Sequence, residues 1–150
     1  MKVLIIGGVA AGTKAAAKLK REDRSAEVTI LTKGGDISYA GCGLPYYVGG
    51  VIPDREQLVV NTPQAFEKLT GARVLTRMEA VGIDRAARTV EAVNEETGEK
   101  SVYEYDKLVI ATGASPFKPD CEGLELQNVF YMRTPDDAAA LRSAVDSGSI

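Results

Sequence analysis

Short hydrophobic runs, each followed by glycine or polar residues, mark the start of the chain. Residues 3–6 and 28–31 are runs of leucine and β-branched residues, typical of strands buried on both faces of a sheet. Between them, Gly12 to Glu22 contains strong helix formers, with alanines that allow close packing on a sheet. A strand, a glycine turn, a helix and a strand in this order predict a βαβ unit with a right-handed crossover.

The middle of the chain predicts a second helix and then a change of strand type. Thr62 and Pro63 suit the N-cap and first position of a helix that ends at Gly71, and residues 72–75 follow as a third parallel strand. From position 79 to 105 hydrophobic and polar residues alternate, in segments separated by polar turns. This period of two predicts a small antiparallel meander inserted in the α/β layer.

The last part of the chain predicts two more strands and a helix. Residues 108–110 are expected to form a buried strand that runs into an Ala-Thr-Gly sequence at 111–113, and residues 129–131 a short last strand. The sequence Thr-Pro-Asp-Asp at 134–137 caps a predicted helix that ends near Gly148, and its acidic first turn suits the helix dipole. The pattern as a whole predicts an α/β fold built on a parallel sheet.

The composition is that of one ordinary globular domain, with 150 residues, 45% of them hydrophobic and 26% charged. The 18 basic and 21 acidic residues give a formal charge of −3 without a long basic tract, which disfavours nucleic-acid binding. Histidine is absent, so this chain supplies no Ser-His-Asp or Cys-His machinery, and we predict no metal site. The N-terminal apolar run is too short for a signal peptide or a membrane span, and we expect a cytoplasmic protein with reduced thiols.

The glycine turn after the first predicted strand is a variant of the dinucleotide-binding turn. Gly7 suits the tight turn, Gly12 suits close helix packing, and the helix N-terminus would face a pyrophosphate, whereas Val9 replaces the usual second glycine. A tight turn without a ligand is the alternative. The predicted cofactor-binding residues of this turn are Gly7, Gly8, Val9, Ala10, Ala11 and Gly12.

Thr32 and Lys33 stand at the end of the second predicted strand, where an acidic residue usually binds the adenosine ribose. The Thr32 hydroxyl can still accept one such hydrogen bond. Lys33 could instead pair with the 2′-phosphate of NADP, so an NADP-binding Rossmann domain stays open as an alternative. A solvated loop charge is an equally good interpretation of Lys33.

Cys42 lies between two glycines, close to a short helix that we expect to carry Pro45 in its first turn. Amides at a helix N-terminus favour the thiolate, and the glycines would let a flavin or a substrate approach the sulfur. Cys42 is therefore the candidate nucleophile. Cys121 lies among acidic residues, which disfavour a thiolate, and we assign it no role.

Three motifs in order and spacing resemble those of the pyridine nucleotide-disulfide oxidoreductases. They are Gly7 to Gly12, Ser38-x-x-x-Cys42-Gly-Leu-Pro45-Tyr46, and Leu108-Val-Ile-Ala-Thr-Gly-Ala-x-Pro116. The single cysteine is similar to the branch of coenzyme A disulfide reductases, persulfide or polysulfide reductases, NADH oxidases and NADH peroxidases. The resemblance implies that residues 1–150 are a Rossmann-like FAD-binding domain, the N-terminal part of a larger reductase whose NAD and dimerisation domains lie outside this sequence.

The resemblance also implies roles for individual residues. Cys42 would lie beside the flavin and cycle between a thiolate and an oxidised form, with Tyr47 where two-cysteine relatives carry the second cysteine. Lys18 and Arg21 would lie near coenzyme A phosphates, although a solvated basic helix end is the alternative. The implied cofactor contacts outside the glycine turn are Thr32, Lys33, Ser38, Val81, Ala111, Thr112 and Gly113, and Ser38 would also line the substrate pocket.

The function implied by the resemblance is NADH-dependent reduction of coenzyme A disulfide, persulfide or polysulfide, through FAD and Cys42, in a full-length homodimer. Ala10 stands where peroxidases and many oxidases of the family carry a histidine, which favours this function over an NADH oxidase that reduces oxygen through a cysteine sulfenic acid. Two further alternatives are an isolated dinucleotide-binding module without activity and a single-domain NADP-dependent reductase.

Overall fold

The computed structural model describes residues 1–148 and divides the chain into two compact units. Unit 1 comprises residues 1–38 and 61–113, and unit 2 comprises residues 39–60 together with those from 114 onward.

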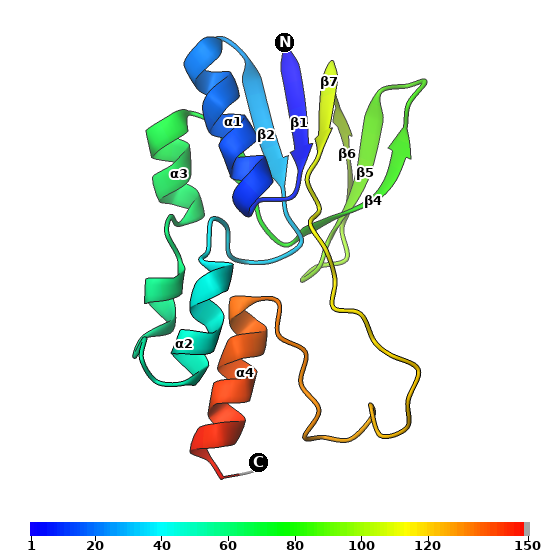
Figure 1. Ribbon diagram of the computed structural model, residues 1–150. Helices are drawn as coiled ribbons and strands as arrows, with labels where there is room; N and C mark the ends of the chain where they lie inside the picture. The colour runs from blue at the N-terminus through cyan, green and yellow to red at the C-terminus, as the bar shows by residue number, and fades with distance from the viewer. Residues whose placement is uncertain (149–150) are drawn as a thin grey trace. The chain divides into compact units, whose positions relative to one another are not determined.

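Unit 1 contains two β-sheets, and both agree with the sequence pattern (Figure 1). The parallel sheet has the order β3-β2-β1-β7, and the antiparallel sheet has the order β4-β5-β6. Helix α1 connects β1 to β2, and α3 precedes β3. The bounds are β1 Lys2–Ile6, α1 Ala10–Glu22, β2 Glu27–Leu31, α3 Pro63–Thr70, β3 Arg73–Leu75, β4 Met78–Asp84, β5 Thr89–Asn94, β6 Lys100–Glu104 and β7 Lys107–Ile110. The predicted βαβ unit and meander are confirmed.

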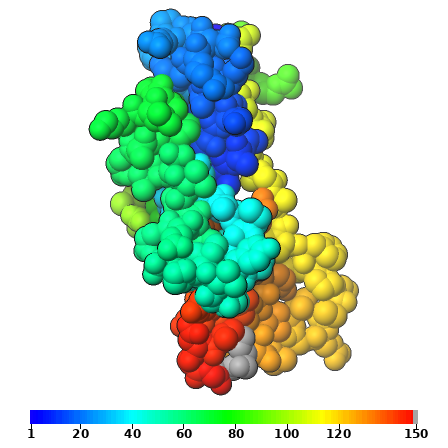
Figure 2. Space-filling view, turned by 60° about the vertical axis from the view of Figure 1, so that its left-hand side comes forward, coloured from blue at the N-terminus to red at the C-terminus, as the bar shows by residue number. Residues whose placement is uncertain are grey.

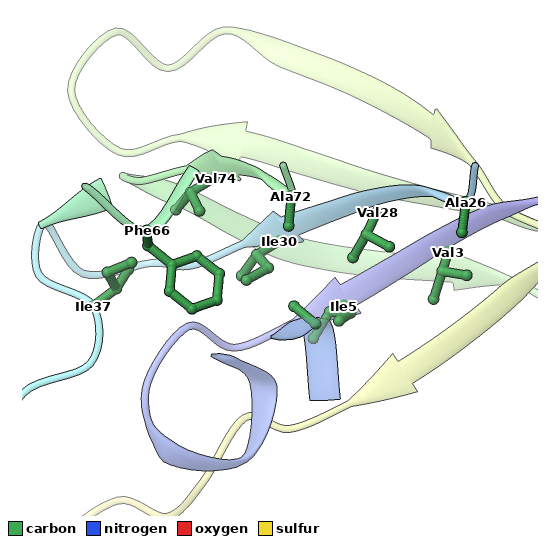
Figure 3. Packing of buried hydrophobic residues seen from close by; sticks show 10 residues of the cluster. Val3, Ile5, Ala26, Val28, Ile30, Ile37, Phe66, Ala72 and Val74 are labelled. Atoms are coloured by element: carbon green, nitrogen blue, oxygen red, sulfur yellow. The ribbon is translucent and has the colours of Figure 1, made fainter. Parts of the chain in front are cut away.

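The central strand β1 carries hydrophobic side chains on both faces at residues 3–6, because the parallel sheet is covered on both faces within unit 1. Val3 and Ile5 of β1 pack toward the helices, where Phe66 of α3 closes the core cluster shown in Figure 3. Leu4 and Ile6 point the other way and pack against the antiparallel sheet. Helices on one face and a small sheet on the other leave the carboxyl ends of the strands free to form a site.

Unit 2 is built from short helical segments. A 3₁₀ turn, η1 (Gly41–Gly43), leads into α2 (Leu44–Val48), and a second 3₁₀ turn, η2 (Arg55–Leu58), precedes the return to unit 1. Helix α4 (Pro135–Asp146) packs on α2 around a core cluster of Leu44, Leu58 and Ala138. The predicted short helix after Cys42 is confirmed.

The predicted helix boundaries are confirmed by their caps. The hydroxyl of Thr62 accepts a hydrogen bond from the Ala65 amide at 3.2 Å, and Gly71 ends α3 with φ +74°, a left-handed conformation that glycine adopts without strain. Thr134 and Asp137 form a reciprocal capping box at the start of α4.

One strand prediction is wrong, and a second is wrong only about burial. The strand at 108–110 exists as β7, but it is not buried: the side chain of Ile110 is 64% exposed, because β7 is an edge strand with β1 as its neighbour. Residues 129–131 form no strand, since the chain there follows a turn in which the Val129 amide donates to the Leu126 carbonyl, and no paired strand lies beside it. Within residues 1–148 no helix is both long and apolar enough to cross a membrane.

Candidate functional site

The glycine turn between β1 and α1 is held by close backbone contacts. Gly7 has φ +111°, and its amide donates to the Leu31 carbonyl at 2.8 Å. A Cβ atom on Gly7 would lie 2.1 Å from the carbonyl oxygen of Ala111, and a Cβ on Gly12 would lie 1.8 Å from that of Gly7. Both positions therefore require glycine. The turn contacts the end of β2 at Leu31 and the residue that follows β7, Ala111.

The same turn gathers the residues that follow β2. A Cβ on Gly8 would lie 3.0 Å from the Cβ of Thr32, so these two residues are in close contact. The Ser38 amide donates to the Gly8 carbonyl at 3.1 Å. Unit 1 therefore brings the predicted residues Thr32, Ser38 and Ala111 to one place, at the carboxyl edge of the parallel sheet.

The N-terminus of α1 has the features of a phosphate site. Its N-cap residue, Val9, makes no side-chain capping bond, and the first turn contains no acidic residue. The first amides of a helix have no partner within the helix, and the helix dipole is positive at that end. Ala10 and Ala11 are exposed there. The turn therefore offers free donors and close backbone approach, and both suit a pyrophosphate.

Lys33 is engaged by carboxylates. Its ammonium lies 2.7 Å from Glu79 and 3.8 Å from Glu95. The hydrogen bond to Glu79 raises the pKa of Lys33 and is the main cause of the lowered pKa of Glu79. Lys33 is thus not a free cation that could receive a 2′-phosphate, and the NADP alternative loses the residue that supported it.

The remaining predicted cofactor residues lie on other parts of unit 1. Val81 is at a β-bulge of β4, between Ala80 and Gly82, where backbone groups leave the regular ladder. Thr112 and Gly113 are exposed after β7. The structure does not join Val81 to the glycine turn by any hydrogen bond among the described residues.

Cys42 is exposed in unit 2, in the 3₁₀ turn that leads into α2. A Cβ on Gly41 would meet no atom within 4 Å, so space is open on that side of the cysteine. A Cβ on Gly43 would instead lie 3.0 Å from the Leu58 side chain. Gly43 is therefore needed for packing, while Gly41 leaves room for a ligand near the sulfur.

Arg142 is a residue of this region that the sequence did not indicate. Its guanidinium donates to the Tyr47 carbonyl at 2.7 Å and lies 5.7 Å from the centre of the Tyr47 ring. It also pairs with Asp146 at 2.9 Å. Arg142 thereby ties the end of α2 to α4. No local signal could have revealed the contact with α2, because Arg142 and Tyr47 are 95 residues apart in the chain.

The residues predicted to bind the substrate do not form one site in the structure. Lys18 pairs with Glu22 at 2.5 Å on the surface of α1. Arg21 lines a groove of about 690 Å³ where α1 meets α3, and Figure 2 shows the surfaces of these two helices side by side. The groove is basic: its charged residues are Lys20, Arg21, Arg24 and Lys68. Lys18 and Ser38 are not among its lining residues.

Cys121 is exposed, and both cysteines are free thiols. No group of three or more Cys, Asp or Glu residues within positions 1–148 is arranged to hold a metal ion.

Comparison with known proteins relates the chain to a family of enzymes. A coenzyme A disulfide reductase of Staphylococcus haemolyticus is 33% identical, over 97% of this chain and 32% of that protein. The crystal structure of reduced Bacillus anthracis CoADR-RHD has a TM-score of 0.96 at 34% identity, over 99% of this chain and 27% of that one. An NAD-dependent persulfide reductase from A. fulgidus has a TM-score of 0.93 at 39% identity, over 99% and 28%.

The chain spans about a third of the length of the curated relatives that it matches. The predicted Rossmann-like fold is confirmed by the solved structures. The family model for pyridine nucleotide-disulphide oxidoreductases, which are FAD-dependent enzymes that use NAD(P)H, matches residues 1–150. On this match over its whole length, the chain belongs to the pyridine nucleotide-disulphide oxidoreductase family.

Proposed function

We propose that residues 1–150 are the FAD-binding part of an NADH-dependent reductase that acts on coenzyme A disulfide, a persulfide or a polysulfide. The observation that carries the proposal is Cys42: its thiol is exposed in the 3₁₀ turn before α2, with open space at Gly41. Tyr47 takes the place of a second cysteine, so the sulfur that pairs with Cys42 would come from the substrate.

The residues of unit 1 fit the pyrophosphate and adenosine of FAD. Gly7 and Gly8 leave no space for a Cβ atom, which keeps the turn tight, and the uncapped start of α1 offers amide donors to phosphate oxygens. Val81, Thr112 and Gly113 are assigned to the same cofactor as backbone contacts. FAD, when bound, supplies two-electron transfer between NADH and sulfur.

Cys42 would act as the nucleophile. Its thiolate attacks one sulfur of the substrate disulfide, so a new S–S bond forms to Cys42 while the substrate S–S bond breaks. The first product leaves as a thiolate and takes a proton from water. Two electrons from NADH then cleave the mixed disulfide, which restores the Cys42 thiolate and releases the second thiol.

The basic groove between α1 and α3 supports a phosphorylated substrate. Arg21 and Lys68 lie on the two helices that form it, and coenzyme A carries several phosphate charges that such residues attract. For Lys18 to bind a phosphate of the substrate, its ion pair with Glu22 must break. The proposal places the complete reductase in the cytoplasm, since thiols stay reduced there. It also includes a homodimer of the complete reductase.

The test is Cys42→Ser in the complete reductase, with Cys121→Ser as the matched control. We expect Cys42→Ser to lose NADH-dependent reduction of coenzyme A disulfide while the flavin absorbance of the purified protein is retained. The Cys121→Ser variant should keep both properties. Disulfide reduction at the wild-type rate by Cys42→Ser would refute the proposal. Oxygen consumption measured on the same samples separates the oxidase alternative, in which oxygen rather than a disulfide accepts the electrons.

A further inference from the structure

The position that usually binds the adenosine ribose has no acid in this protein. Dinucleotide-binding folds place Asp or Glu at the end of the second strand, where its carboxylate accepts a hydrogen bond from the ribose 2′-hydroxyl. Here that position is Thr32, whose side chain is only 7% exposed and packs against Gly8. A buried hydroxyl is a weaker acceptor than a carboxylate.

We propose that Glu79 of β4 supplies this carboxylate and accepts the hydrogen bond from the adenosine ribose of FAD. The inference rests on the proposed function, because it requires that unit 1 binds FAD.

The backbone around Thr32 places Glu79 next to the end of β2. The Thr32 amide donates to the Leu75 carbonyl at 3.0 Å, and the Met78 amide donates to the Thr32 carbonyl at 3.0 Å. The chain therefore passes from β3 to β4 alongside Thr32, and Glu79 is the residue that follows this contact. Glu79, an acid of the antiparallel sheet, thus lies next to the end of β2, where the parallel sheet has Thr32 instead of an acid.

Lys33 holds the Glu79 side chain in place. The Lys33 ammonium binds one carboxylate oxygen, Oε1, at 2.7 Å. A carboxylate has about four acceptor positions, so the pair with Lys33 leaves others for a ribose hydroxyl. The Glu79 side chain is 38% exposed, which leaves it accessible to a ligand. Lys33 is a positioning residue in this arrangement, rather than a direct ligand of the cofactor.

The local charge also favours a hydroxyl over a phosphate. Lys33 contributes one positive charge, whereas Glu79 and Glu95 contribute two negative charges. The lowered pKa of Glu79 keeps its carboxylate ionised at neutral pH. A ribose that donates a hydrogen bond suits this site, and a 2′-phosphate would be repelled by it.

The experiment titrates the FAD-free form of the complete reductase with FAD and with its 2′-deoxyadenosine analogue, following flavin fluorescence. We expect wild-type protein to bind FAD about tenfold or more tightly than the analogue, the range for a hydrogen bond to a charged acceptor. In Glu79→Ala this preference should fall to about one, through weaker binding of FAD and little change for the analogue. The matched control is Glu91→Ala, which removes an acid of the same sheet that pairs with Lys100 at 3.0 Å.

The outcomes separate this inference from the proposed function. A wild-type preference for FAD that survives in Glu79→Ala, or a wild-type protein that binds both flavins equally, overturns the role of Glu79 but leaves FAD binding intact. Loss of the preference in Glu91→Ala would equally overturn it, because the effect would then follow general charge. A wild-type protein that binds neither flavin would refute the proposed function and this inference with it. Thermal unfolding midpoints of both variants show whether they are folded.

Discussion

Gly12→Ala tests whether the glycine turn is as tightly packed as the structure shows. In an ordinary helix this change is favourable, since alanine has a helix propensity about 1 kcal/mol better than glycine. At this site the new Cβ would lie 1.8 Å from the Gly7 carbonyl oxygen and 3.2 Å from the Ile5 side chain. Gly12 is also buried. The two effects oppose each other, so the sign of the result is informative.

The Gly7 carbonyl has little freedom to move away. Its residue is bound through the amide to Leu31 and lies against the backbone of Ala111. Overpacking in a tight region costs about 1–3 kcal/mol, and an overlap with backbone belongs at the upper end. After the gain of about 1 kcal/mol from propensity, a net loss of about 2 kcal/mol remains. For a protein of this size, that loss lowers the thermal unfolding midpoint by roughly 4–8 °C.

The assay is thermal unfolding followed by circular dichroism, with Gly41→Ala as control. That substitution makes the same chemical change where a Cβ meets no atom within 4 Å, so its midpoint should stay close to that of the wild type. A Gly12→Ala midpoint equal to or above the wild-type value would refute the reasoning. It would mean that the turn relaxes at little cost and that close packing does not require glycine there.

Three further predictions concern the core, a cap and a charge pair. Phe66→Ala removes a 5%-exposed ring from the main core and should cost about 3–5 kcal/mol, seen as a large fall in the unfolding midpoint; a fall of a degree or two would contradict this packing. Asp137→Ala opens the capping box with Thr134 and should cost about 1 kcal/mol by the same measurement, and an unchanged midpoint would argue against the cap. The pKa of Glu79 is lowered chiefly by its hydrogen bond from Lys33. The pair therefore stabilises the fold fully above the ordinary carboxyl pKa of 4.5, and this effect is lost as the pH falls from there through the lowered pKa of Glu79. The midpoint difference between wild type and Glu79→Gln should therefore be full at neutral pH and shrink as the pH falls below 4.5. A difference that does not change with pH would refute the assignment.

Much of unit 1 could be predicted from short-range patterns. The runs at 3–6 and 28–31 predicted strands buried on both faces, and the caps at Thr62 and Gly71 predicted the limits of α3. These signals are local, because a cap or a hydrophobic period depends on residues within one element. Residues 129–131 are different, since a short apolar run forms a strand only if a partner strand lies beside it, and none of the described strands does here.

Some residues of the candidate site are likewise indicated by the sequence, and others only by the structure. The sequence alone indicates the glycine turn and Cys42 as candidates, because the residues of each motif are contiguous in the chain. The assignment of Lys33 could not be settled, because its partner Glu79 is brought to it by the path of β4. Arg142 gave no signal at all, since its role depends on the packing of α4 against α2.

The sequence by itself determined most of the helices and strands, where the turn after β1 carries glycine, and which thiol is the candidate nucleophile. Only the tertiary structure decided that β7 is an exposed edge strand, that Gly7 contacts the backbone of Ala111, and that Lys33 forms ion pairs with carboxylates. The physical reason is that a pattern along the chain reports which face of an element is buried, but not which distant residue covers it. Contacts between distant segments depend on the order and register of the strands, and these set the chemistry available at the carboxyl edge of the sheet.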